Sequence, residues 1–395
     1  MRSNYEALGK HIRLVDVRNS DMSTDRLLGI NIDKYFMPSV ANVIGTDLSR
    51  YKLITKGRFA CNPMHVGRDE RLPVALYTED DPAIVSPAYF MFEIIDESVL
   101  LPEYLMMWFK RAEFDRICWL KTDGSVRGGI SWDDIELLGL PVPTLNKQKE
   151  IVKAYQTITN RIALKRKINE CLEATARSYF KSLFAPYASK TKVELPNGWM
   201  WANVGDYCNE NIAHISSSDI QNGIFYLNTS SVTQNYFDPL QTIQGDSEVP
   251  SRAKRKVYHG DIVFSTVRPN LKHYGIVYYP VANMVVSTGF TVLHNNNQGV
   301  SNELLYLWIT NDSISEYLQS IVENSVSTYP TLNVNDLLAV KIVVPDKEIL
   351  EKANHFLGVI FFSIRENNRE IQQMTTLQDV LLPKFCQAVN ITSFE

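Results

Sequence analysis

Residues 146–184 read NKQKEIVKAYQTITNRIALKRKINECLEATARSYFKSLF and contain neither glycine nor proline. Apolar residues recur in this segment at alternating spacings of four and three, which is typical of a coiled-coil seam. We therefore predict one long helix, spanning about 55 Å at a rise of about 1.5 Å per residue. The predicted seam positions are Ile151, Tyr155, Ile158, Ile162, Asn169 and Leu172.

A second long helix is predicted from about Lys347 to Leu382, where Gly358 weakens it by up to about 1 kcal/mol relative to alanine. One small domain cannot bury a helix this long, so we expect the two helices to pack antiparallel on each other. The polar Asn169 and Asn368 would then help to fix their register. The alternative is that each helix packs on its own domain with its asparagine in water. The seam positions of the second helix are Leu357, Phe361, Ile364, Asn368 and Ile371.

The rest of the chain repeats itself with a period of about 200 residues, which fits a duplicated domain plus helix. Each half contains a turn glycine with a strand-like run, a short strand, an apolar helix, and a polar loop that leads to a strand and a proline. The matching segments are 56–63 with 259–266, 86–94 with 287–294, 101–109 with 301–309, and 124–143 with 324–345.

This order predicts an α+β protein in which two similar domains are separated by two long helices packed as an antiparallel coiled coil. The predicted division is a first domain at 1–145, a central helix at 146–187, a second domain at 188–345 and a distal helix at 346–395.

The composition is that of an ordinary globular protein, with 45% apolar and 21% charged residues and a net charge of −4. The five cysteines form no C-x-x-C pair, so neither a zinc site nor a disulfide framework is indicated. No apolar run reaches the roughly 20 residues of a membrane-spanning helix, and the first residues contain no signal-peptide core. We therefore expect a cytoplasmic protein without membrane contact.

Lysine and arginine cluster outside the long helices, and such clusters can neutralise DNA phosphates, while Arg, Asn, Gln and Ser can read base edges. The alternative is ordinary solvated surface. In the first half the candidate DNA-binding residues are Lys56, Arg58, Arg68, Arg71, Ser125 and Arg127. In the second half they are Lys254, Arg255, Lys256, Arg268, Lys272 and His273.

Motifs for catalysis are missing from the sequence. It has no G-x-x-x-x-G-K-[ST] phosphate loop and no G-x-G-x-x-G, and it lacks the N-P-P-[YF] signature of amino-methyltransferases. The E-x-K of a common nuclease core is also missing near Pro345. The sequence thus predicts a binding protein with no catalytic residue, metal site or cofactor of its own.

Four short segments, in order along the chain, carry a family resemblance: LPVPTLNKQKEIV (140–152), SYFKSLF (178–184), ELPNGWMWANVGD (194–206) and VLLPKF (380–385). The whole chain resembles the specificity subunits of type I restriction–modification enzymes. One departure is the tail, which often continues with Ser-Gly-Glu in the family but reads Cys386-Gln387-Ala388 here. The departure bears on docking at that end and not on the fold.

The resemblance implies that each domain is a target-recognition domain that reads one half of a split, asymmetric site in double-stranded DNA. It implies that the helix pair is a spacer and the dock for two methyltransferase subunits, which carry S-adenosylmethionine and methylate adenine. Restriction and translocation subunits would add ATP- and Mg-dependent cleavage. The alternatives are a restriction enzyme chain with its own degenerate nuclease, or a structural adaptor that does not bind DNA.

Overall fold

The computed structural model describes residues 5–41, 45–64, 66–122, 128–187, 194–244, 249–324 and 331–385. The chain forms two compact units, of which unit 1 comprises residues 1–164 and 371–395 and unit 2 comprises residues 165–370. Each unit thus contains one domain and one end of both long helices. Among the described residues, no helix has the length and apolarity that crossing a membrane requires.

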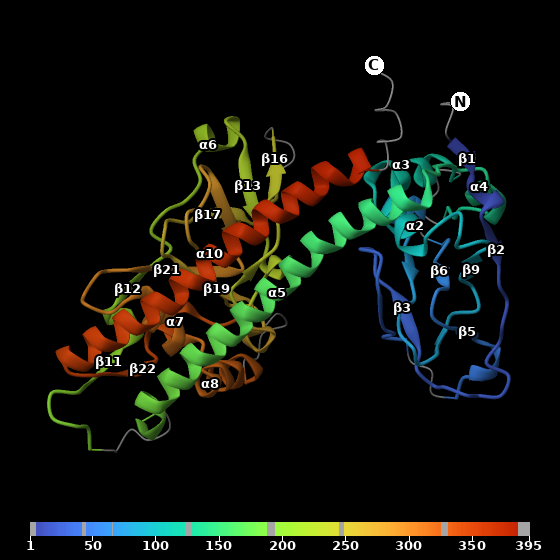
Figure 1. Cartoon of the computed structure of the whole chain (residues 1–395). Coiled ribbons are helices and arrows are strands. Elements are labelled where there is room, and N and C mark those ends of the chain that lie inside the picture. The colour runs from blue at the N-terminus through green and yellow to red at the C-terminus, as the bar shows by residue number, and fades with distance from the viewer. Residues whose placement is uncertain are drawn as a thin grey trace. The chain divides into compact units, whose positions relative to one another are not determined.

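The two predicted long helices are confirmed as α5 (Leu145–Phe184) and α10 (Lys347–Phe385), drawn in green and in orange-red in Figure 1. Helix α5 ends two residues before Pro186, which lies in a short 3₁₀ turn, η3 (Ala185–Tyr187). Helix α10 runs three residues beyond the predicted end at Leu382 and includes Pro383 in its last turn. Pro383 has no amide proton, so the Asp379 carbonyl four residues before it receives no helical hydrogen bond from this position.

Unit 1 is built on a four-stranded antiparallel sheet of order β2-β9-β6-β7, accompanied by the strand pairs β1–β10, β3–β4 and β5–β8. Its strands are β1 (Tyr5–Ala7), β2 (Ile12–Leu14), β3 (Leu28–Ile30), β4 (Phe36–Pro38), β5 (Lys52–Ile54), β6 (Phe59–Cys61), β7 (Val74–Leu76), β8 (Ala83–Val85), β9 (Phe90–Ile94) and β10 (Gly139–Pro141). Its short helices are α1 (Val66–Asp69), α2 (Pro102–Phe109), α3 (Ala112–Leu120) and α4 (Trp132–Glu136).

Unit 2 contains a sheet of order β12-β21-β18-β19, a second sheet of order β16-β13-β20-β17, and the pairs β11–β22 and β14–β15. Its strands are β11 (Met200–Asn203), β12 (Cys208–Glu210), β13 (Ile224–Leu227), β14 (Val232–Thr233), β15 (Tyr236–Phe237), β16 (Gln241–Ile243), β17 (Ala253–Lys256), β18 (Ile262–Ser265), β19 (Tyr274–Ile276), β20 (Met284–Ser287), β21 (Phe290–Asn295) and β22 (Lys341–Val344). Its short helices are α6 (Ser217–Gln221), α7 (Asn302–Ile309), α8 (Asp312–Glu323) and α9 (Val334–Leu338).

The predicted internal duplication is confirmed by this topology, because β2-β9-β6-β7 and β12-β21-β18-β19 have the same order along the chain and in the sheet. The turn glycines correspond as well: Gly57 and Gly260 have φ angles of 86° and 87°, a left-handed conformation that favours glycine. Helices α2 and α7 correspond in turn and bury Trp108 and Trp308 in the two cores. Ser301 caps α7 by accepting a hydrogen bond from the Leu304 amide.

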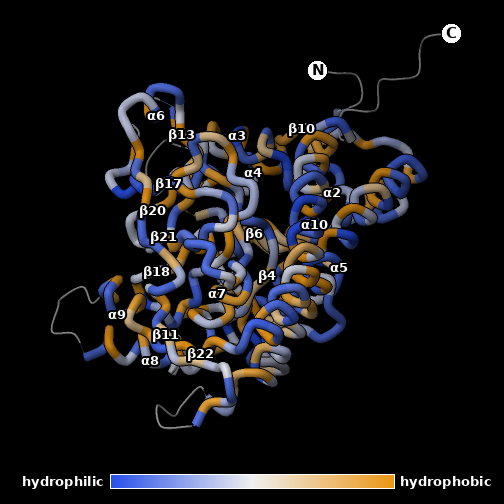
Figure 2. The backbone as a smooth tube through the Cα atoms, turned by 90° about the vertical axis from the view of Figure 1, so that its left-hand side faces the viewer, coloured by the Kyte–Doolittle hydropathy of each residue, from blue (hydrophilic) through white to orange (hydrophobic). Residues whose placement is uncertain are grey.

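The seam residues of the long helices pack into these same cores. In unit 1, Ile151 and Leu382 belong to the core that contains Trp108, and Gln378 donates a hydrogen bond to the Thr159 hydroxyl across the helix pair. Of the predicted seam positions, Ile151, Ile162, Leu357, Phe361, Ile364 and Ile371 are buried, whereas Tyr155, Ile158, Asn169, Leu172 and Asn368 are half-buried. Figure 2 shows hydrophobic and hydrophilic residues alternating along both helices.

A polar layer interrupts the apolar seam in unit 2. Asn169 donates to the Asn368 side-chain oxygen at 2.7 Å and accepts from Asn367 at 2.8 Å. Lys165 donates to Asn367 at 2.9 Å and pairs with Glu370 at 3.0 Å. Further along the pair, where the chains have run in opposite directions, the Tyr179 and Phe356 rings lie 4.3 Å apart. The helices therefore pack antiparallel, and a slip of register would leave these polar groups without partners.

We predict that Asn169→Ala lowers the free energy of unfolding by about 1–2 kcal/mol, because Asn368 loses its donor and Asn367 loses its acceptor in a half-buried seam. The double variant Asn169→Leu/Asn368→Leu should recover most of this loss, since apolar seams tolerate leucine. Urea unfolding of the full chain measures both effects, with exposed Asn160→Ala on the same helix as the control. A double variant that is less stable than the single one would show that the layer does not act as a unit.

Candidate nucleic-acid interface

The first and fourth repeated segments, far apart in sequence, meet in both units. In unit 1 the loop between β6 and β7 contains α1, and the Gly67 amide donates to the Gly128 carbonyl at 2.9 Å. The Ile130 amide donates to the Pro63 carbonyl at 3.2 Å. Gly129 allows the close approach at this junction, since a Cβ atom there would lie only 3.0 Å from the Pro63 carbonyl oxygen. Residues 128–130, which follow the fourth repeated loop, are therefore bonded to the β6–β7 loop.

Unit 2 repeats this junction with a different loop. The Leu332 amide donates to the Thr266 carbonyl at 2.8 Å, and Val267 forms a β-bridge with Thr331. The β18–β19 loop contains the 3₁₀ turn η7 (Pro269–Leu271), which is flanked by Arg268 and Lys272 at φ angles of 50° and 56°.

Left-handed backbone is unfavourable for both residues, so the surrounding contacts must hold them. The loop is pinned from α8 by a hydrogen bond of 3.3 Å from the Asn270 amide to Gln319. The backbone beside Arg268 is thereby tied to α8.

Most of the candidate cations are paired with carboxylates. The pairs are Lys56 with Asp80 at 2.6 Å, Arg58 with Glu93 at 3.2 Å, Arg68 with Asp69 at 2.6 Å, Arg71 with Asp33 at 3.1 Å, Lys256 with Asp219 at 2.8 Å, and Lys272 with Asp312 at 3.4 Å. Hydrogen bonds from Lys256 and Ser216 hold the pKa of Asp219 at about 2. A cation neutralised in this way attracts a phosphate less than a free one does.

The remaining candidates differ in their accessibility. Lys254 and Arg268 are exposed and form no ion pair within the described part of the chain. Arg255 is half-buried, and burial lowers its pKa. His273 is held by a hydrogen bond of its Nδ1 atom with the Val232 carbonyl oxygen at 2.6 Å. Ser125 and Arg127 lie outside the described residues.

Among the described residues, the candidates lie at separate places on the sheets of each unit. Lys56 and Arg58 lie at the glycine turn that precedes β6, whereas Arg68 and Arg71 follow the opposite end of that strand. In unit 2, Lys254 lies on β17 of the second sheet, whereas Arg268 lies after β18 of the first. The geometry thus favours Arg268 and Lys254 as the accessible cations.

The sequence did not predict that two arginines of α5, Arg166 and Arg177, contact the unit 2 domain. The guanidinium of Arg166 lies 5.2 Å from the Tyr236 ring, and that of Arg177 lies 5.7 Å from the Tyr306 ring. Arg177 also pairs with Glu173 at 2.7 Å, and the Tyr306 hydroxyl donates to Glu173 at 2.9 Å. Tyr306 is fully buried, and burial together with the Glu173 charge raises its pKa well above the usual value.

Comparisons with known proteins agree with this architecture. Residues 74–174 match the family described as "Type I restriction modification DNA specificity domain". The type I restriction enzyme HindI specificity subunit of Haemophilus influenzae is 29% identical over 182 residues, which are 46% of this chain and 39% of that protein. The MjaIX specificity subunit of Methanocaldococcus jannaschii is 23% identical over 310 residues, covering 74% of this chain and 69% of that protein.

The fold of the whole chain is similar to a solved structure. The crystal structure of the type I restriction–modification system S subunit from M. genitalium aligns with a TM-score of 0.52 and 15% identity, covering 96% of this chain and 95% of that one. This likeness concerns the fold: two α+β domains joined by long helices. The chain is thus similar to type I restriction–modification specificity subunits, in sequence over residues 74–174 and over parts of two relatives, and in fold over nearly its whole length.

Proposed function

We propose that this chain is the DNA sequence-recognition subunit of a type I restriction–modification system, in which it binds a split, asymmetric site in double-stranded DNA. The observation that carries the proposal is the duplicated junction of two loops on one sheet scaffold. The junction residues correspond, Pro63 with Ile130 in unit 1 and Thr266 with Leu332 in unit 2, but the loops they hold carry different side chains. Different side chains read different hydrogen-bond patterns in the major groove.

In this proposal the chemistry belongs to partner subunits. Two methyltransferase subunits bring S-adenosylmethionine and methylate adenine, and restriction subunits bring ATP- and Mg-dependent translocation and cleavage. The chain itself works as a non-catalytic reader in the cytoplasm and needs no cofactor. The comparisons give no support to the two alternatives, a nuclease of its own or an adaptor that does not bind DNA.

The decisive experiment maps methylated adenines in DNA from cells that express this chain together with its methyltransferase partner. We expect a two-part motif that disappears when the gene for this chain is deleted, because the partner alone lacks the reader. A motif that persists without this chain would contradict the proposal. The purified chain alone should transfer no methyl group from S-adenosylmethionine, and measurable transfer would contradict the assignment of catalysis to the partner.

We predict that the accessible cations dominate the salt dependence of DNA binding. Lys254→Ala and Arg268→Ala should each flatten the slope of log K against log salt by about one unit if each neutralises one phosphate. Lys256→Ala should change the slope less, since Asp219 already neutralises this lysine. Titrations of labelled duplex DNA at several salt concentrations measure the slopes. Equal slopes for wild type, Lys254→Ala and Arg268→Ala would show that both residues are ordinary surface.

A further inference from the structure

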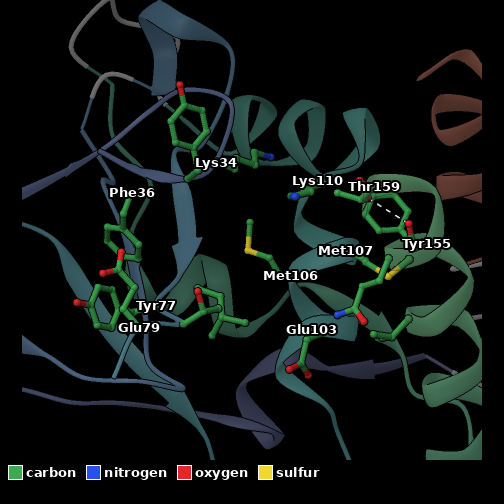
Figure 3. A pocket seen from close by; sticks show the side chains of 15 residues that line it. Lys34, Phe36, Tyr77, Glu79, Glu103, Met106, Met107, Lys110, Tyr155 and Thr159 are labelled. Atoms are coloured by element: carbon green, nitrogen blue, oxygen red, sulfur yellow. Dashed lines mark hydrogen bonds between the residues drawn. The ribbon is translucent and has the colours of Figure 1, made fainter. Parts of the chain in front are cut away.

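Unit 1 contains a cleft of about 370 Å³ beside the end of β7, lined by residues of β4, α2 and α5 (Figure 3). Tyr77 and Glu79 form one side, and Met106, Met107 and Glu103 of α2 form the other. Tyr77, Met106 and Met107 are buried in the protein, whereas Glu103 is exposed. The cleft therefore combines an apolar wall with a carboxylate at its rim.

The internal duplication identifies the corresponding place in unit 2. The amide of Tyr77 donates to Arg58 and its carbonyl accepts from Gly57, while Val277 makes the same two bonds with Asp261 and Gly260. The residues that follow therefore correspond, Thr78 with Tyr278 and Glu79 with Tyr279.

The helices can be matched in the same way. In the first turn of α5 the Gln148 amide donates to the Thr144 carbonyl. In the first turn of α10 the Leu350 amide donates to the Asp346 carbonyl in the same way. Nineteen residues further along, Ala163 of α5 corresponds to Arg365 of α10.

In unit 2, large side chains occupy this place. The Arg365 guanidinium lies 5.5 Å from the Tyr278 ring and 5.2 Å from the Tyr279 ring. The Tyr278 hydroxyl donates to Glu303 of α7 at 2.8 Å. The neighbouring Tyr306 and Phe361 rings pack edge to face at 5.7 Å. Tyrosine, arginine and glutamate thus close the space between the strand end and the helices.

In unit 1 the same positions carry smaller or unlike side chains. Thr78 and Ala163 replace Tyr278 and Arg365, and Glu79 is engaged by Arg26 at 2.6 Å. Glu103 corresponds to Glu303, but Thr78 carries no phenol and forms no hydrogen bond with Glu103 within the described residues. Within the described residues Glu103 has neither a hydrogen bond nor an ion pair. Unit 1 therefore retains the acceptor and the apolar wall and lacks the tyrosine.

We propose that this cleft is the docking site for a tyrosine-bearing segment of a protein partner, whose phenol ring packs on Met106 and Tyr77 and whose hydroxyl donates to Glu103. Methionine adapts its shape to an inserted ring and contacts aromatic rings favourably. The ammonium of Lys110 lies 5.9 Å from the Tyr155 ring at the same cleft, so its positive charge offsets that of Glu103 and a neutral phenol suits the cleft. The inference does not depend on DNA binding.

The probe for the test is the peptide YGIVYYPV, which copies residues 274–281 of this chain and carries the two tyrosines that close unit 2. We expect a labelled form to bind the full chain saturably, as followed by fluorescence anisotropy. Phenylalanine in place of both tyrosines in the YY pair should weaken binding several-fold, because the donor to Glu103 is lost. Failure of the wild-type chain to bind the peptide saturably would overturn the proposal.

Variants of the chain locate the site. Glu103→Ala should weaken binding about ten-fold or more, and Thr78→Tyr should abolish it by filling the cleft from within. Glu316→Ala, which removes an exposed carboxylate on α8, should leave binding unchanged. Thermal unfolding reports whether Thr78→Tyr remains folded, and the surface variant Glu103→Ala decides the question if it does not. Binding that survives both substitutions in folded protein would place the peptide elsewhere.

Discussion

The register of the helix pair is the constraint on which the rest of unit 2 depends. An apolar seam alone tolerates slips by whole turns, whereas the bonded side chains of Asn169, Asn367 and Asn368 are satisfied in one alignment. This alignment fixes where α5 presents Arg166 and Arg177 and where α10 presents Phe361 and Arg365. These side chains hold the domain through tyrosines from several elements, so the polar layer specifies how the domain is attached as well as how the helices pair.

The duplication separates what both units share from what each unit changes. The four-stranded sheet, the glycine turn and the buried tryptophan recur because they form the core and its tightest turn. The loops after β6 and β18 differ in length and chemistry, although both are tied to the segment that follows the fourth repeated loop. A conserved frame with exchangeable loops suits a protein that reads two different half-sites, since the frame positions the loops and the loops choose the contacts.

Much of the fold was predictable from sequence, whereas the candidate site was not. Residues 146–184 predicted α5 because a run without glycine or proline and with seam spacing has few alternatives to a helix. The repeat predicted the shared topology through local signals such as Gly57 and Gly260. The partners of Lys256 or Arg177 are different: Asp219 and Tyr306 lie 37 and 129 residues away, and a single sequence carries no signal for such pairing. For the same reason the sequence does not predict the cleft beside Glu103, whose lining comes from segments far apart along the chain.

The central claim is that the two units read DNA independently. Its most direct test replaces residues 1–145 by the corresponding domain of another specificity subunit and maps methylated adenines in cells that express the hybrid with its methyltransferase partner. The account predicts that one half of the two-part motif changes to that of the donor while the other half stays as in the parent. A change in both halves, or a hybrid that keeps the complete parental motif, would contradict it.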